Sequence, residues 1–248
     1  MNRKFHNPFP ILHLTGIFIK EHLREPTVLF WTLLSPALIF YGMSYTADRT
    51  ATGSDHYLEL SRWYYSYISL NVALFGFSYY LIGRRESGFI RSFVYTKKAQ
   101  MKFLTSHTLS YLLLATLYCV AFYLITKPYA GPLDMAELVV ITLRYGICYL
   151  LFSAVGVLFT LAPLKFQTAG TLFSIISFGS VISSLLSERR DAEWLAYAPF
   201  LNPLKLASNF ISTGEVTITA ATACVMTVIA GATLAMTSFR VNPVWSRY

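Results

Sequence analysis

The sequence predicts an all-α integral membrane protein with six transmembrane helices and an N-terminal interfacial helix. Three observations predict it: the composition, the length of the apolar runs and the distribution of charge between them. Of the 248 residues, 55% are hydrophobic and 13% are charged, and the mean hydropathy is +0.50. Soluble domains carry about 25% charged residues, so this chain has too few charges to cover a solvated surface. The composition therefore excludes a soluble enzyme and a disordered chain.

Six apolar runs are long enough to cross a bilayer, which takes about 20 helical residues because the hydrocarbon layer is about 30 Å thick. They are residues 27–46, 63–82, 103–126, 138–161, 168–186 and 216–239. The fifth run is rich in serine and glycine but carries no charge. We therefore expect a cytoplasmic N-terminus (1–26), a six-helix transmembrane domain (27–239) and a cytoplasmic tail (240–248).

The charges between the runs predict the orientation. The N-terminal segment, the loops 83–102 and 162–167 and the C-terminal tail together hold 13 basic and three acidic residues, whereas the opposite side holds six basic and nine acidic residues. Short loops rich in Lys and Arg remain in the cytoplasm. Both termini are therefore expected on the cytoplasmic face of a bacterial inner membrane.

The segment before the first run, residues 8–25, is too short and too polar to cross the bilayer. Four of its residues form one narrow polar stripe at helical spacing: His13, Gly16, Lys20 and Arg24. This pattern predicts a helix along the inner membrane interface with its cations toward the headgroups, and packing on neighbouring spans is a compatible alternative. Pro26 suits the first turn of the next helix, and Pro36 predicts a kink within the first span.

Sequence motifs for catalysis and for ion coupling are absent. The six runs contain no Asp or Glu and a single charge, Arg144, so they lack the carboxylates that ion-coupled carriers place in their spans. No HExxH, no GxSxG and no Gly-Lys of a phosphate-binding loop occurs. We expect neither enzyme activity nor a metal in this chain. Arg144 is expected to reach toward the outer headgroups or Glu137, with a substrate contact as the alternative.

The loop 83–102 is the most informative stretch. It holds six basic residues, one acid and interleaved aromatic residues. Phe89, Ile90 and Phe93 would share one side of a short helix on the membrane surface and would face the bilayer or a partner. The simpler interpretation is a basic loop that only sets topology. The functional interpretation is a docking surface for a cytosolic protein.

Short motifs in this loop and elsewhere make the chain similar to a known family. They are Arg24-Glu25-Pro26, Leu34-Ser35-Pro36, Glu86-Ser87-Gly88 followed by Phe93, Ala198-Pro199 and Asn202-Pro203. In these motifs the chain resembles the integral-membrane permease of type-2 ABC exporters. The resemblance implies the type-2 ABC exporter permease fold, with a coupling helix at about 84–96 and an outer re-entrant segment at about 194–210. The chain departs from the family at Lys97, where a proline often stands, and at Phe178-Gly179-Ser180, which no proline follows closely.

The resemblance also implies partners. Family members assemble as two permease copies with two cytosolic ABC ATPase subunits, so a homodimer in the lipid bilayer is expected, with ATP and Mg bound by the ATPase and no cofactor bound by this chain. No nucleic acid partner is expected. The implied ATPase-coupling residues are Arg84, Arg85, Glu86, Gly88, Arg91 and Phe93.

The cargo is approached through the many aromatic residues of the second run. An interfacial belt is the simpler explanation, and a translocation path is the alternative. The path candidates are Tyr64, Tyr67, Phe75, Tyr79 and Arg144. The expected function is the outward export of a small toxic or amphipathic substrate, such as an antimicrobial peptide or a drug, which could give the producer immunity. The alternatives are export of a polysaccharide, lipid-linked glycan or lipo-oligosaccharide, and a membrane scaffold without transport.

Overall fold

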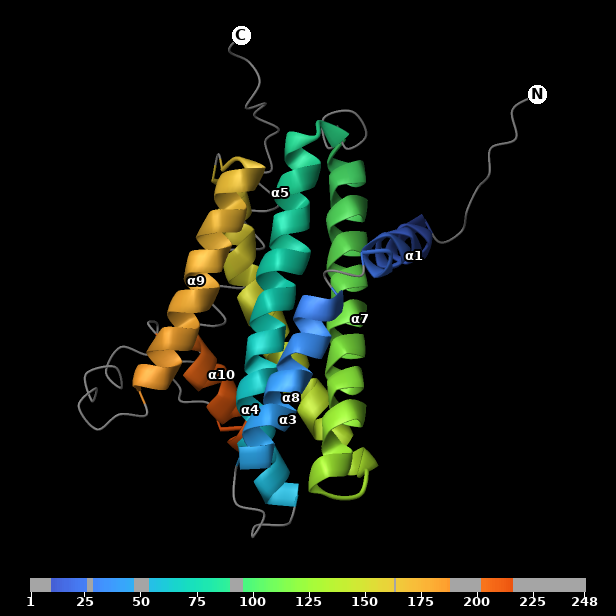
Figure 1. Ribbon diagram of the computed structural model, residues 1–248. Helices are drawn as coiled ribbons and strands as arrows, with labels where there is room; N and C mark the ends of the chain where they lie inside the picture. Colours follow the sequence, from blue (N-terminus) through green and yellow to red (C-terminus); the bar gives the residue numbers. More distant parts are fainter. Residues whose placement is uncertain are drawn as a thin grey trace.

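A computed structural model describes residues 10–25, 29–46, 54–89, 96–162, 164–187 and 202–215. Within these ranges all regular structure is helical. The elements are α1 (Pro10–Leu23), η1 (Phe30–Leu34), α3 (Ser35–Thr46), α4 (Ser54–Asn71), η2 (Val72–Ser78), α5 (Tyr79–Glu86), α7 (Lys97–Ala130), α8 (Met135–Leu161), α9 (Phe166–Leu186) and α10 (Pro203–Thr213). In Figure 1, α1 lies crosswise at α7, whereas α4, α5, α7 and α9 run roughly alongside one another.

Three helices in the described ranges are long and apolar enough to cross a membrane. They are Lys98–Ala130, Met135–Thr160 and Phe166–Leu186. They contain nearly all of the third, fourth and fifth apolar runs, which confirms the helical prediction for these three. The elements α4, η2 and α5 follow one another without a gap and contain the second run, and η1 with α3 covers most of the first. The sixth run, 216–239, and residues 194–201 of the outer segment lie outside the described residues, so six spans remain a prediction.

A π-helical turn lies where the sequence predicts a kink. The turn η1 ends next to Ser35, whose amide donates to the carbonyl of Phe30, five residues earlier. Pro36 follows directly and has no amide proton to continue the α-helical ladder. Widened turns of this kind are a common way for a helix to absorb such a break. The irregularity at Pro36 is therefore a π-helical turn on its N-terminal side.

A second π-helical turn, η2, lies in the middle of the long helical stretch. The Ser78 hydroxyl donates to the carbonyl of Ala73 at 2.9 Å. In a regular α-helix this carbonyl would accept from the amide four residues later, a pattern that a π-helical turn changes. Gly156 of α8 packs directly on this hydroxyl, because a Cβ at position 156 would come within 2.0 Å of it. The turn therefore brings α8 close to the centre of the second predicted span.

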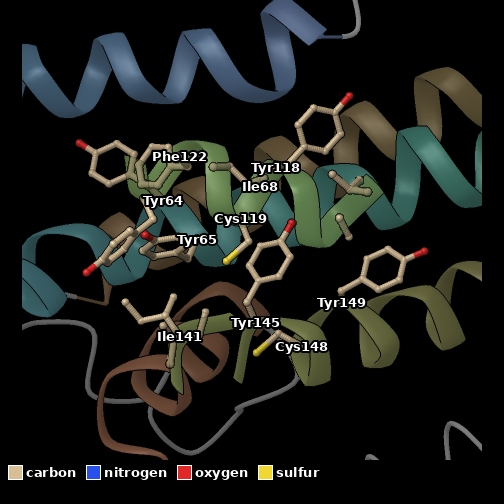
Figure 2. Packing of buried hydrophobic residues seen from close by; sticks show 14 of the residues in the cluster. Tyr64, Tyr65, Ile68, Tyr118, Cys119, Phe122, Ile141, Tyr145, Cys148 and Tyr149 are labelled. Carbon is tan, nitrogen blue, oxygen red and sulfur yellow. The ribbon is translucent and has the colours of Figure 1, made fainter. Parts of the chain in front are cut away.

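The core consists largely of aromatic side chains from α4, α7 and α8. Figure 2 shows Tyr65 of α4, Phe122 of α7 and Tyr145 of α8 converging on one cluster. The rings of Tyr65 and Phe122 meet edge to face with centroids 5.0 Å apart. Lipid is as apolar as these side chains, so close packing rather than water exclusion holds such helices together. The buried hydroxyl of Tyr65 is paired with that of Tyr57 at 2.7 Å, as buried phenols require.

The N-terminal helix α1 packs on α7. Thr15, Phe18 and His22 form its buried face, and the Phe18 ring meets that of Phe103 of α7 at 5.7 Å. The four residues of the polar stripe that the sequence predicts are all exposed. Packing on a neighbouring helix, the alternative considered for this segment, is thus observed. A position at the membrane interface remains a prediction.

Candidate functional site

Three consecutive charged residues, Arg84, Arg85 and Glu86, form the last turn of α5. All three are half-buried. Successive side chains on an α-helix point about 100° apart, so three neighbours in sequence can reach three different parts of the molecule. The structure uses this property, because each residue contacts a different element.

Arg84 connects α5 to the N-terminal helix. Its guanidinium forms an ion pair with Glu21 of α1, and the Tyr80 hydroxyl donates to the same carboxylate. The guanidinium also lies over the ring of Phe89, 4.9 Å from its centroid. An ion pair this exposed contributes only about 0–1 kcal/mol on its own, but the shared tyrosine and the ring contact fix its geometry.

Arg85 caps the C-terminal end of α8. Its guanidinium donates to the carbonyls of Thr160, Ala162 at 2.9 Å and Leu164 at 2.6 Å. The last carbonyls of any helix lack intrahelical partners and carry partial negative charge. The last turn of α8 contains no basic residue of its own. Arg85 supplies the missing cation from another helix.

Glu86 caps the N-terminal end of α9. Its carboxylate accepts a hydrogen bond from the Phe166 amide at 2.5 Å. The N-cap residue of α9 is Lys165, whose side chain makes no capping hydrogen bond. A carboxylate is favoured at this position by the free amides and by the helix dipole. Together Arg85 and Glu86 complete both helix ends of the α8–α9 turn.

An aromatic contact also connects α5 to the start of α9. The ring of Tyr79 stacks on that of Phe166 with centroids 4.0 Å apart. Gly83 lies one turn further along α5, and a Cβ there would come within 3.0 Å of the Phe166 ring. The glycine therefore allows α5 to approach the start of α9 closely.

The remaining coupling residues are only partly described. Gly88 has a positive φ of 74°, a conformation that favours glycine and commonly ends helices. The chain turns there, so residues 84–86 belong to α5 and the implied coupling helix of about 84–96 is interrupted at Ser87 and Gly88. Arg91 and Phe93 lie outside the described residues. Contact with an ATPase remains a prediction for all six residues.

Three of the four aromatic path candidates pack on rings from other helices of the same chain. Tyr64 is buried and packs on Phe40 of α3, with centroids 5.6 Å apart. Tyr67, Phe75 and Tyr79 are half-buried. Tyr67 stacks on its neighbour Trp63, whereas Phe75 and Tyr79 both meet Phe173 of α9 edge to face. The fold thus brings Phe75 and Tyr79 together and leaves Tyr64 apart from them, and a role in a path remains a prediction.

Arg144, the fifth path candidate, caps α10. Its guanidinium donates to the carbonyls of Ile211 at 2.8 Å and Ser212 at 2.6 Å. Gly214 closes the helix with a φ of 75°, and a Cβ there would come within 2.6 Å of the guanidinium. The Arg144 contacts reach a helix end rather than Glu137, which pairs with Lys127. A substrate contact remains a prediction.

The Lys127–Glu137 pair is the feature that the sequence analysis missed. Both side chains are buried, with 4% and 7% of their surface exposed. The Lys127 ammonium lies over the ring of Tyr57, 4.7 Å from its centroid, and the Tyr123 hydroxyl donates to Glu137 at 3.2 Å. Both residues lie just outside the apolar runs 103–126 and 138–161, so a search for charges within the runs does not find the pair. Their separation by one short turn between two helices could have suggested the pairing.

Among the described residues, no group of three or more His, Cys, Asp or Glu side chains could hold a metal ion. Three apolar helices of membrane length in an all-helical architecture define the chain as a multi-pass membrane protein. The chain is similar to protein McbE of Escherichia coli, with 29% identity over 239 residues, which cover 95% of this chain and 98% of McbE. No protein-family model matches the chain.

Proposed function

We propose that this chain is the membrane-spanning permease of an ABC exporter whose ATP is hydrolysed by a separate cytosolic subunit. The observation that carries the proposal is the joint at the end of α5, where Arg84, Arg85 and Glu86 hold α1, α8 and α9. A force applied to the basic segment that follows α5 would reach three helical elements at once. Such a joint suits a subunit that is moved from its cytoplasmic face.

The proposal includes six spans with both termini in the cytoplasm. The excess of basic residues on the α5–α7 side supports this orientation. The lack of a phosphate-binding loop motif and of carboxylates within the apolar runs supports an external energy source. The similarity to McbE extends over 95% of this chain, so the compared region spans α5, α8 and α9.

A second copy of the chain is part of the proposal. Large apolar side chains are exposed on most of the described helices, including Trp31 in η1 at 64% and Phe178 in α9 at 66%. In a bilayer such side chains contact lipid or another permease copy. In a homodimer a translocation path would lie between the two copies. The half-buried Phe75 and Tyr79 are the aromatic candidates that contact α9.

The proposed cargo is a small toxic or amphipathic molecule such as an antimicrobial peptide, whose export would protect the producing cell. The loops between the predicted spans are too short to form a carbohydrate-binding module. Aromatic side chains can stack on heterocycles and peptide rings. These two features favour a small amphipathic cargo over a long polysaccharide.

The test is coexpression of the chain with an ABC ATPase, which the proposal expects a neighbouring gene to encode. We expect the two proteins to copurify in detergent, ATP hydrolysis to respond to the permease in proteoliposomes, and cells carrying the pair to resist a panel of antimicrobial peptides. An ATPase with its phosphate-binding lysine replaced is the matched control and should abolish resistance. Recovery of the chain as a lone monomer, with no change in sensitivity, would support the scaffold alternative.

A further inference from the structure

The turn between α8 and α9 obtains both of its caps from another helix. Within the described turn, α8 ends without a basic residue and α9 begins without a side-chain cap. Arg85 and Glu86 of α5 are adjacent in sequence. Arg85 donates to carbonyls at the end of α8, and Glu86 accepts from the first amide of α9. Two opposite charges thus meet the two opposite ends of helix dipoles.

We infer that Arg85 and Glu86 are positioning residues that lock the α8–α9 turn to the end of α5, so that the turn moves together with the segment that follows α5. The locking rests on the contacts described above. Its use in transmitting motion rests on the proposed function.

The geometry of the lock is specific. A guanidinium is a planar fork that can serve several carbonyls at once, and Arg85 reaches three. The Glu86 carboxylate makes a charge-assisted bond to a backbone amide, which is stronger than a neutral one. The stacked ring of Tyr79 and the glycine at position 83 hold the two elements at close range. Polar bonds, an aromatic stack and close backbone approach therefore act on the same pair of elements.

This inference changes the role implied for the two residues by the family resemblance. Both residues make hydrogen bonds within the chain, and these bonds give them a role that needs no direct contact with the ATPase. Direct docking would then depend on other residues of the loop 83–102. Arg84 is the matched comparison, since it has the same charge and neighbouring position but pairs with Glu21 of α1.

The first experiment measures hydrogen exchange in the purified chain in nanodiscs, without any ATPase. In Glu86→Ala, the Phe166 amide should exchange about tenfold faster, because it loses its acceptor. Glu86→Gln keeps an acceptor oxygen and should stay near the wild-type rate. Arg84→Ala should leave this amide unchanged, and protection within α7 reports that each variant is folded. An unchanged Phe166 rate in folded Glu86→Ala would overturn the lock.

The second experiment adds the ATPase and uses the charge exchange R85E/E86R, which keeps the net charge but places each charge at the wrong helix end. The lock predicts normal copurification of the ATPase together with loss of permease-dependent stimulation. Lost copurification would show a docking contact and overturn the positioning role. If R85E/E86R does not fold, Arg85→Lys takes its place, with the same split between binding and stimulation expected.

The two experiments separate the inference from the proposed function. An ATPase that fails to bind the wild-type chain would overturn the proposed function and the transmitting role together. The exchange rate at Phe166 decides the lock independently, because that measurement needs no partner.

Discussion

At the scale of single residues, three cations complete helix C-termini that belong to other elements or adjacent turns. Arg85 donates to the end of α8, Arg144 to the end of α10, and Lys205 to the Ser187 carbonyl at the end of α9. Free carbonyls are costly where water is scarce. A long cationic side chain can reach such a carbonyl while its stem remains among apolar groups. In these three places a cationic side chain from elsewhere in the chain pairs with carbonyls at a helix C-terminus.

The cap at α10 gives a prediction for Arg144. Arg144→Ala leaves the carbonyls of Ile211 and Ser212 without their donor, which should lower the free energy of unfolding by about 1–3 kcal/mol. Arg144→Lys should recover part of the loss, since an ammonium can still donate to a carbonyl but is more compact and more strongly hydrated than a guanidinium. The measurement is the thermal midpoint in detergent, with a fall of about 2–4 °C expected per kcal/mol.

Arg62→Ala is the control for this prediction, because the Arg62–Glu59 pair is partly exposed. Its loss should change the free energy of unfolding by no more than about 1 kcal/mol. Equal thermal midpoints for Arg144→Ala and the wild type would show that Arg144 does not stabilise the end of α10.

At the scale of elements, the hairpin of α7 and α8 is closed by the buried Lys127–Glu137 pair. Removing one partner of a buried pair leaves an uncompensated charge, which costs about 3–5 kcal/mol, whereas replacing both by apolar residues is often neutral. Glu137→Leu should therefore destabilise the hairpin strongly. The double variant Lys127→Met with Glu137→Leu should be nearly as stable as the wild type. Thermal unfolding of both variants tests this, and a double variant that is no more stable than Glu137→Leu would contradict it.

The docking of α1 on α7 gives a prediction about pH. Burial lowers the pKa of His22, whose ring accepts or donates hydrogen bonds with Tyr118 at 2.9 Å. Docked α1 therefore holds a neutral imidazole, while the undocked histidine takes up a proton near pH 6.5. The contribution of His22 to docking is present above about pH 6.5 and is lost as the pH falls below it.

Hydrogen exchange within α1 at pH 7.5 and 5.5, corrected for the intrinsic exchange rates, measures this effect. The protection of α1 should fall at the lower pH, and His22→Phe should remove that dependence. His13 is exposed on the same helix, so His13→Ala should leave it intact. Equal protection of α1 at both pH values in the wild-type chain would contradict the prediction that protonation of His22 weakens its docking.

At the scale of the whole molecule, local signals predict the helices but not the contacts between them. The apolar runs 103–126, 138–161 and 168–186 mark three membrane-length helices. Each can be recognised from the length and composition of its own residues. The joint at α5 depends on tertiary proximity: nothing in the sequence around Glu86 shows that its acceptor atoms meet the Phe166 amide, 80 residues later. Likewise, no proline marks the π-helical turn η2, where the Ser78 hydroxyl bonds the Ala73 carbonyl and Gly156 packs closely.

The orientation of the molecule gives the last prediction. The helix α7 has 34 residues, and a rise of 1.5 Å per residue makes it about 50 Å long, which exceeds the hydrocarbon thickness of about 30 Å. Ser87 precedes α7 and Leu133 follows it, and both are exposed, so single cysteines at these positions should lie on opposite sides of the membrane. The excess of basic residues near Ser87 predicts that this side is cytoplasmic. A membrane-impermeant thiol reagent should label Ser87→Cys in inside-out vesicles and Leu133→Cys in intact spheroplasts. The reverse pattern would place the joint at α5 outside the cell, where no ATP-hydrolysing partner could act on it.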